Sequence, residues 1–405
     1  MAYYLRQLFN IPLAVIFALL LCGNLIGLAS GIPSVITAGV SVCVAFFYLR
    51  RGGNIDYLML LFLIYLPIEL LLSNPDSRFH SWERMAMFTM MMVSVSPLVQ
   101  SEYARRFRLH TLQILIMVIM VASVCSFFCY FLGINLMVRN NTNEYVGIAG
   151  HFGGIFNHSM KLGPMASLSS MFFTYKAFVT KRKWLFVLSS VCACAVLFSA
   201  SRGSFVALIG GTFFLMYKYS EDRSQLMKIF LTTVVLLAIT YPIWNGAMTG
   251  LEQKQVGNVR MGGTFASRTS KWLNRISEFE SSPLWGIGFS SIDPNTHEYW
   301  NKTKGIIEPG TSWLSILSML GIVGFTLFMI IFWKAYTSVF HSANNRCILL
   351  YSFLIFYSIH MITEGYIFAA GNPVCVFFWL LLACCYDTKY AENEESEKDD
   401  NLSIL

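Results

Sequence analysis

Charged residues are scarce in this chain: only 13% of its 405 residues are Asp, Glu, Lys or Arg, whereas 56% are hydrophobic. This balance excludes an ordinary soluble domain, because apolar stretches nearly as long as a membrane span recur along the whole chain. Only helices and closed barrels satisfy the backbone in lipid, and continuous apolar stretches favour helices. We therefore predict an all-α, polytopic membrane helical bundle with about 12 transmembrane helices.

The chain also lacks the patterns of a disulfide-bonded or metal-binding protein. Its ten cysteines lie inside or at the ends of apolar stretches, which is typical of packing residues. His151, His158 and His297 have no metal-ligand spacing, so we expect no metal and no cofactor. The net charge of +7 is explained by basic loops, and no nucleic-acid partner is implied.

The basic connections between apolar stretches predict the orientation in the membrane. Three of them, at residues 49–51, 105–108 and 181–183, fall on one side, which is then cytoplasmic. Both termini are predicted to be cytoplasmic, and residues 1–387 are predicted to form a single membrane domain. The acidic segment 388–405 is predicted to be a disordered cytoplasmic tail. The predicted spans are 10–30, 33–49, 56–73, 85–100, 111–133, 162–180, 184–200, 203–219, 228–246, 311–333, 347–367 and 373–387.

A long polar segment, residues 245–310, separates spans nine and ten on the non-cytoplasmic side. It exceeds ordinary connection lengths, so it should carry structure and function. Within it, Thr269 to Glu280 places Trp272, Ile276 and Phe279 on one helical face, which predicts an amphipathic helix on the membrane surface. The alternative is a lid with scattered charge.

Arginines on the outer side are the first candidate site residues. Arg202 interrupts an apolar run from 184 to 217, which is too long for one span and predicts two helices joined by a tight turn. A guanidinium at that depth needs a polar cavity, a partner or an anion, although snorkelling to a lipid phosphate is an alternative. The planar fork of arginine suits a lipid diphosphate. Arg260, Arg268 and Arg275 of the long segment are further candidates.

Two ionisable residues near the end of span eleven form a second candidate group. His360 and Glu364 are four positions apart and share a helical face. They would line a cavity or form a satisfied hydrogen-bonded pair inside the bundle.

Several segments between residues 145 and 370 resemble the O-antigen polymerase and ligase superfamily, which comprises bacterial membrane glycosyltransferases. Gly153 to Gly163, which contains His158, is similar to an outer loop of that family, and Ser199-Ala-Ser-Arg-Gly203 is similar to its SxSRG turn. Arg268-Thr-Ser-Lys-Trp272 and Ser282-Pro-Leu-Trp-Gly-Ile-Gly-Phe289 follow in the same order as in the family.

The resemblance implies a periplasmic-face glycosyltransferase of the bacterial inner membrane. Arg202 and Arg268 would hold the diphosphate of an undecaprenyl-diphosphate-linked glycan donor, and a second such glycan would be the acceptor. The transfer would be inverting and metal-independent, since the main electrostatic task is to stabilise the departing diphosphate. The implied partners are the lipid bilayer, a flippase and a chain-length regulator.

One departure from the family pattern favours a polymerase over a ligase. Ligases carry a histidine at the position that is Gly310 in this chain. Gly310-Thr311 is followed by nine residues and then by Gly321-Ile-Val-Gly324, so the frame is kept but the histidine is absent. Glu308 is then a candidate general base and His297 a second, although Pro309-Gly310 also suits a simple turn. The alternatives are an O-antigen ligase that uses His297 or His158, and a 12-span secondary transporter. The sequence shows no internal repeat of the kind that many transporters have.

Overall fold

A computed structural model describes residues 12–26, 34–137, 152–219, 266–295, 307, 309–340 and 344–402. Within these residues the protein is mostly helical (78%), and its only strand pair is β1 with β2, which is antiparallel. The elements are α2 (Pro12–Leu25), α3 (Ser34–Arg51), β1 (Asn54–Ile55), α4 (Tyr57–Ser73), η2 (Ser77–Phe79), α5 (Ser81–Val95), β2 (Val99–Gln100), α6 (Glu102–Phe131), α7 (Ser159–Thr180), α8 (Trp184–Phe198), α9 (Arg202–Tyr219), α12 (Ala266–Ser281), α13 (Ser312–Phe340), α14 (Asn345–Thr363) and α15 (Pro373–Leu402).

The predicted helical character is confirmed, whereas the predicted number of spans stays a prediction. Three of the described helices, α6, α13 and α14, are long and apolar enough to cross a membrane. Shorter apolar helices occur within α2, α3, α4, α8 and α15. The ninth predicted span, 228–246, lies outside the described residues. Large apolar side chains such as Leu71, Val121 and Phe213 are exposed on the helices, as expected for surfaces that face lipid.

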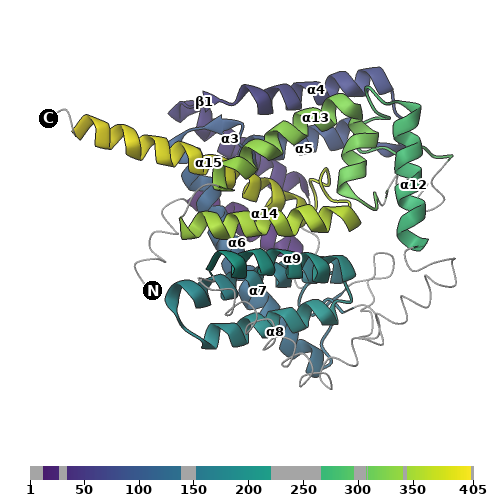
Figure 1. Ribbon diagram of the computed structural model, residues 1–405. Helices are drawn as coiled ribbons and strands as arrows, with labels where there is room; N and C mark the ends of the chain where they lie inside the picture. Colours follow the sequence, from purple (N-terminus) through teal and green to yellow (C-terminus); the bar gives the residue numbers. More distant parts are fainter. Residues whose placement is uncertain are drawn as a thin grey trace.

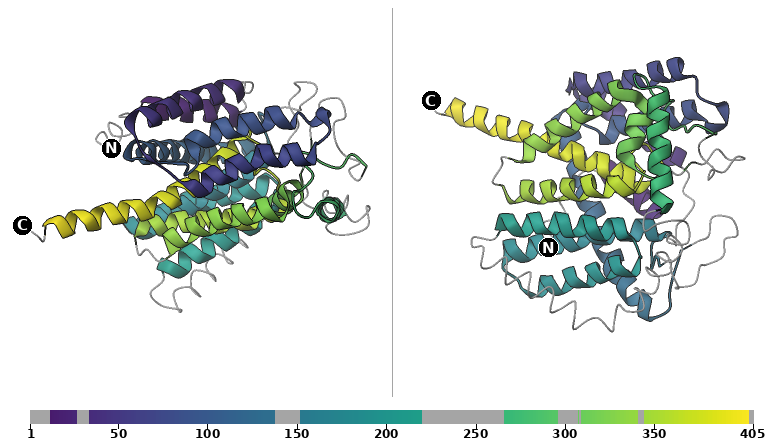
Figure 2. Two further views of the ribbon diagram at one scale, coloured as in Figure 1. Left: turned by 90° about the horizontal axis from the view of Figure 1, so that it is seen from above. Right: turned by 45° about the vertical axis from the view of Figure 1, so that its right-hand side comes forward.

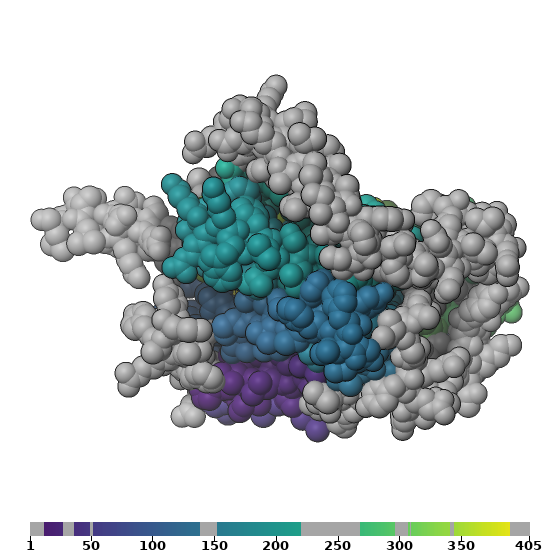
Figure 3. All heavy atoms as spheres, turned by 90° about the horizontal axis from the view of Figure 1, so that it is seen from below, coloured from purple at the N-terminus to yellow at the C-terminus, as the bar shows by residue number. Residues whose placement is uncertain are grey.

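Most helices lie side by side along one direction, and α12 crosses the bundle near one end (Figures 1 and 2). Helix α14 is central, because it packs against α7, α9, α13 and α15. On the face seen in Figure 3, the blue band that includes α6 lies between the teal band of α7 to α9 and the purple N-terminal helices. We call the end that carries the α8–α9 turn, α12 and residues 364–372 the outer end, and the opposite end the inner end.

The apolar core is built around Trp379 of α15. Its ring lies 5.8 Å from the rings of Phe88 and Phe328 and 6.1 Å from that of Phe62, measured between centroids. Its indole nitrogen donates to the carbonyl of Ile367 at 3.0 Å, so the only polar atom of the side chain is satisfied. The contacts join α4, α5 and α13 to α15 and fix the loop that follows α14.

Helix α6 begins nine residues earlier than its predicted span at 111–133. Ser101 caps it, with Oγ accepting from the amide of Ala104 at 3.1 Å. Arg108 is fully buried within the helix because Asp387 of α15 accepts two hydrogen bonds from it, at 2.7 and 2.8 Å. Sequence periodicity alone predicts the helix only after the arginines of residues 105–108, because a charge is unexpected inside a bundle unless it is paired.

Helix α15 continues to Leu402, so it extends into residues 388–402, where the sequence predicts a disordered tail. This segment contains no proline or glycine, and its Ala, Glu and Lys residues are good helix formers. Local propensity therefore accounts for the helix where an apolar pattern is lacking.

Candidate functional site

The α8–α9 turn positions Arg202 at the outer end. Helix α8 ends at Phe198 and α9 starts at Arg202, so the predicted pair of helices joined by a tight turn is confirmed. A Cβ atom on Gly203 would lie 2.1 Å from Oγ1 of Thr363, which shows how closely α9 approaches the end of α14. Only glycine permits this approach. The first turn of α9, which carries the partly buried Arg202, is thereby placed against Thr363 at the end of α14.

Helix α7 packs against the same turn. A Cβ on Gly163 would lie 2.7 Å from Oγ of Ser204 and 2.9 Å from Cβ of Ser201. His158 precedes this helix and caps it, since its Nδ1 accepts from the amide of Met160 at 3.1 Å. The Gly153–Gly163 segment thus contributes to the outer end through a helix start whose capping residue is His158.

His360 is buried between hydroxyl groups of two neighbouring elements. Its Nε2 lies 3.1 Å from Oγ of Ser204, and its Nδ1 lies 3.2 Å from the hydroxyl of Tyr366. Ser204 in turn lies 2.8 Å from Ser201, measured between the Oγ atoms. The side chain of His360 thus bonds to Ser204 and Tyr366, whereas that of Glu364 pairs with Arg268, and the predicted roles of the two residues stay predictions. The contacts of His360 connect α9 to the loop after α14.

Arg268 of α12 forms an ion pair with Glu364 at the end of α14. Nη2 of Arg268 lies 2.7 Å from Oε1 of Glu364, and the two side chains are 22% and 12% exposed. Nη1 of Arg268 donates to the carbonyl of Gly310 at 3.2 Å. Three candidate positions that are far apart in the sequence, Arg268, Gly310 and Glu364, therefore meet at the outer end. They lie next to Thr363 and hence close to the α8–α9 turn that carries Arg202.

Arg275 lies two helical turns further along α12 and is completely buried. It forms an ion pair with Glu278 at 2.8 Å, and it donates to the carbonyl of Ser291 at 3.2 Å and to Oγ of Ser318 at 3.1 Å. Burial lowers the pKa of Arg275, and the Glu278 carboxylate opposes that shift. These contacts attach α12 to α13 and to the segment that follows α12.

The amphipathic helix predicted at Thr269 to Glu280 is confirmed as α12, with its charged face turned toward the protein. Arg275 and Glu278 are buried, whereas Leu273 and Ile276 are 59% and 41% exposed. The periodic pattern predicts that the helix has an apolar and a charged face, but it does not predict which of them packs against the rest of the protein. Contact of the apolar face with the membrane surface stays a prediction.

The Gly286-Ile-Gly-Phe289 segment forms a turn that docks on a kink in α13. Gly321 has a non-helical backbone at the kink, and the amide of Ile322 donates to the carbonyl of Pro283 at 2.8 Å. Conversely, the amide of Ile287 donates to the carbonyl of Ser318 at 3.0 Å. A Cβ at Gly286 would lie 2.2 Å from the carbonyl oxygen of Met319, so the motif glycines permit backbone-to-backbone docking.

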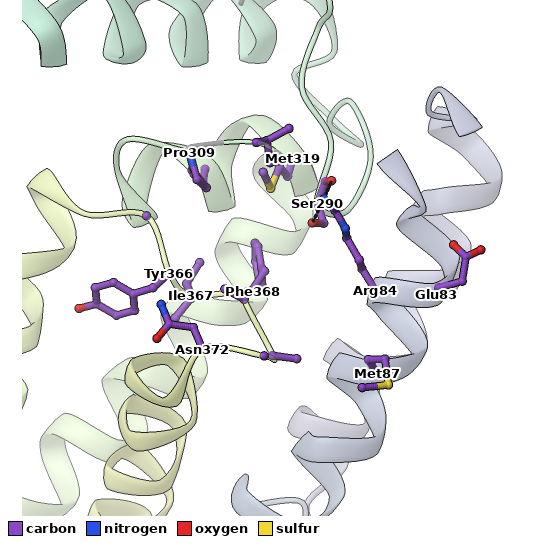
Figure 4. Close-up of a pocket in the computed structure, with 16 residues that line it drawn as sticks. Glu83, Arg84, Met87, Ser290, Pro309, Met319, Tyr366, Ile367, Phe368 and Asn372 are labelled. Carbon is purple, nitrogen blue, oxygen red and sulfur yellow. Dashed lines mark hydrogen bonds between the residues drawn. The ribbon is translucent and has the colours of Figure 1, made fainter. Parts of the chain in front are cut away.

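A cavity of about 490 Å³ adjoins this site and was not predicted from the sequence. Arg84 and Glu83 of α5 line it on one side, and the loop after α14 lines it on another (Figure 4). The two residues carry no sequence signal beyond that of ordinary charges in the first turn of a helix. Three other candidates, Glu308, His297 and Arg260, lie outside the described residues.

The sequence model of the O-antigen ligase family matches residues 184–329. The match begins at the first residue of α8 and ends within α13, so it includes Arg202, Arg268 and the docked glycine turn. A search of curated proteins returns no match. Residues 184–329 are therefore similar to the O-antigen ligase family, and this match supports the resemblance to the O-antigen polymerase and ligase superfamily. Enzymes of this family act on lipid-linked glycans in the membrane during surface polysaccharide synthesis.

Proposed function

We propose that the protein is a polymerase that joins undecaprenyl-diphosphate-linked oligosaccharide repeat units into O-antigen or a related surface polysaccharide. The observation that carries the proposal is the meeting of Arg268, Glu364 and Gly310 beside the turn that presents Arg202. The reaction would occur on the periplasmic face of the bacterial inner membrane. A flippase would supply the substrate, and a chain-length regulator would act on the product.

Arg202 and Arg268 would bind the donor diphosphate. Arginine remains charged at any working pH and donates two parallel hydrogen bonds to a phosphate group. The first turn of α9 adds backbone amides that favour an anion. Arg260 remains a further candidate for this role. Arg275 is given a positioning role instead, since its side chain is buried and its Nη1 is bonded to Glu278, Ser291 and Ser318.

The chemistry of the proposed transfer is a single displacement at the anomeric carbon. An acceptor hydroxyl attacks that carbon, the bond to the phosphate oxygen breaks, and its electron pair leaves with the diphosphate. One such displacement inverts the anomeric configuration. The two guanidinium groups neutralise the charge that develops on the leaving oxygen, which is the largest electrostatic requirement of the step. The proposal requires no metal.

The hydroxyl proton needs an acceptor, and the proposal assigns this role to Glu364. When the diphosphate binds Arg268, it competes with Glu364 for the same guanidinium, and the carboxylate becomes available to take the proton. The exchange occurs next to Gly310, where the ligase pattern has its histidine. Glu308 and His297 remain the alternatives from the sequence.

A ligase is the second candidate, and the description of the matching family favours it. It would transfer the lipid-linked glycan to lipid A-core and would need another base in place of the histidine. His158 is one candidate, but its Nδ1 already caps α7. A purified protein that joins glycan to lipid A-core without extending lipid-linked chains would favour the ligase.

The decisive experiment is extension of a synthetic lipid-diphosphate repeat unit in vitro, with chain length measured on a gel. We expect Arg202→Ala and Arg268→Ala to lower the rate by roughly a hundredfold or more, as for other groups that stabilise transition-state charge. Arg78→Ala is the matched control, because the exposed Arg78 also lies in an outer connection but pairs with Asp76. Wild-type extension by both site variants would refute the diphosphate site.

A further inference from the structure

The cavity beside the arginine site has walls of mixed character. Glu83 and Arg84 of α5, Ser290 and Asn372 supply polar groups. Met87, Met319, Ile367 and Phe368 supply apolar surface. Figure 4 shows Arg84 extending from α5 toward Ser290, with Asn372 and Phe368 on the loop that follows α14. Nη1 of Arg84 donates to Oγ of Ser290 at 3.3 Å, which orients the guanidinium across one side of the cavity.

Two crossing segments belong to both the cavity and the arginine site. Pro309 and Gly365 line the cavity, while the adjacent Gly310 and Glu364 contact Arg268. A Cβ on Gly365 would lie 2.5 Å from Cβ of Pro309, so the segments touch where they cross. A molecule in the cavity would therefore contact Pro309 and Gly365, each of which is the direct sequence neighbour of a residue that contacts Arg268.

We propose that this cavity binds the glycan of the acceptor repeat unit, with Arg84 as a residue that recognises its hydroxyl groups. The inference rests on the proposed polymerase function and adds the second substrate site that a polymerase requires. A volume of about 490 Å³ lies within the range of small-molecule sites. It admits a short oligosaccharide portion and is too small for a polyprenyl chain.

The chemistry of the walls favours a sugar over the other parts of the substrate. A hydrocarbon chain would displace water from Arg84 and Asn372, which costs free energy. Among the described residues that line the cavity, Arg84 is the only Lys or Arg, whereas the proposed diphosphate site has two arginines. A sugar ring presents hydroxyl groups to charged and amide side chains, and C–H faces to apolar and aromatic ones. The mixed lining matches that combination.

The test uses the full-length protein and two forms of the cell's own substrate. The lipid-linked repeat unit is extracted from cells that lack this chain, and part of it is hydrolysed to release the lipid-free oligosaccharide. The released oligosaccharide should inhibit extension by the wild type. In Arg84→Met we expect its inhibition constant to rise by roughly tenfold to a hundredfold, which is typical of a lost hydrogen bond from a charged group.

A second variant and a control separate binding from misfolding. Ala369→Trp fills the cavity from an exposed position on its wall and should have the same effect as Arg84→Met. Arg78→Met is the matched arginine control, and the oligosaccharide should inhibit this variant as strongly as the wild type. Binding of undecaprenyl diphosphate should be unchanged in all three, because Arg268 and Arg202 are intact.

The outcomes distinguish this inference from the proposed function. If the oligosaccharide does not inhibit the wild type, or inhibits both cavity variants as strongly as the wild type, the acceptor site is elsewhere. The polymerase would still stand if Arg268→Ala abolishes extension. If instead Arg268→Ala extends normally, the proposed function itself is wrong.

Discussion

Glu364 pairs with Arg268, and the proposed reaction assigns it the proton of the acceptor hydroxyl. In Glu364→Gln the side chain still accepts a hydrogen bond from Arg268 but no longer accepts a proton. We expect turnover to fall by about 10²–10⁴-fold, the range for loss of a general base. Binding of undecaprenyl diphosphate should persist or tighten, because a neutral amide competes less for the guanidinium.

The matched control for this prediction is Asp76→Asn, which removes another outer carboxylate from an arginine pair. Turnover and binding of undecaprenyl diphosphate are measured on the same preparations. If Glu364 merely positioned Arg268, both quantities would fall together in the Gln variant. Normal turnover would exclude Glu364 as the base and return the role to Glu308 or His297.

At the residue scale, the sequence predicts the members of the site better than their contacts. Arg202, Glu364 and Arg268 are detectable because each is charged next to apolar segments near one membrane surface. The pairing of Arg268 with Glu364 joins positions 96 residues apart, and no local pattern reports it. Arg84 was missed for the same reason, since its contact with Ser290 spans 206 residues.

At the scale of elements, the buried Arg275–Glu278 pair lies within α12, and hydrogen bonds from Arg275 to Ser291 and Ser318 attach this helix to its neighbours. A positioning role of Arg275 can therefore be separated from a binding role. Arg275→Met leaves Glu278 as a buried charge without its partner, which costs about 3–5 kcal/mol. We expect amide hydrogen exchange to accelerate in residues 266–281, with a loss of extension activity. The double variant Arg275→Met, Glu278→Leu removes both charges and should recover most of the protection.

The double variant is also the control for function. If Arg275 only positions α12, recovered protection should bring recovered binding of undecaprenyl diphosphate. A double variant with normal protection but no such binding would show that Arg275 contacts the diphosphate. The periodicity of Thr269 to Glu280 predicted the helix, yet the direction of its charged face depends on Ser291 and Ser318, which belong to other elements.

At the scale of the whole molecule, composition predicts a helical membrane protein because burial of so much apolar surface needs lipid or a bundle core. The central place of α14 was not predictable, since it depends on close approaches at glycines such as Gly203 and on long-range aromatic packing. The early start of α6 was missed because the partner of Arg108 lies 279 residues away in α15.

The Arg108–Asp387 pair should therefore support stability without affecting the chemistry. Asp387 lies 14 residues after Pro373, the first residue of α15, which places it about 21 Å from the outer end at 1.5 Å per residue. In Asp387→Asn, Arg108 stays buried without its countercharge, and we expect a loss of about 3–5 kcal/mol. Thermal unfolding in detergent should show a lower midpoint, while extension activity per folded molecule stays at the wild-type level. Glu102→Gln, which breaks an exposed pair with Arg106 on the same helix, should shift the midpoint little. Equal midpoints for the two variants would show that the buried pair carries no more stability than an exposed one.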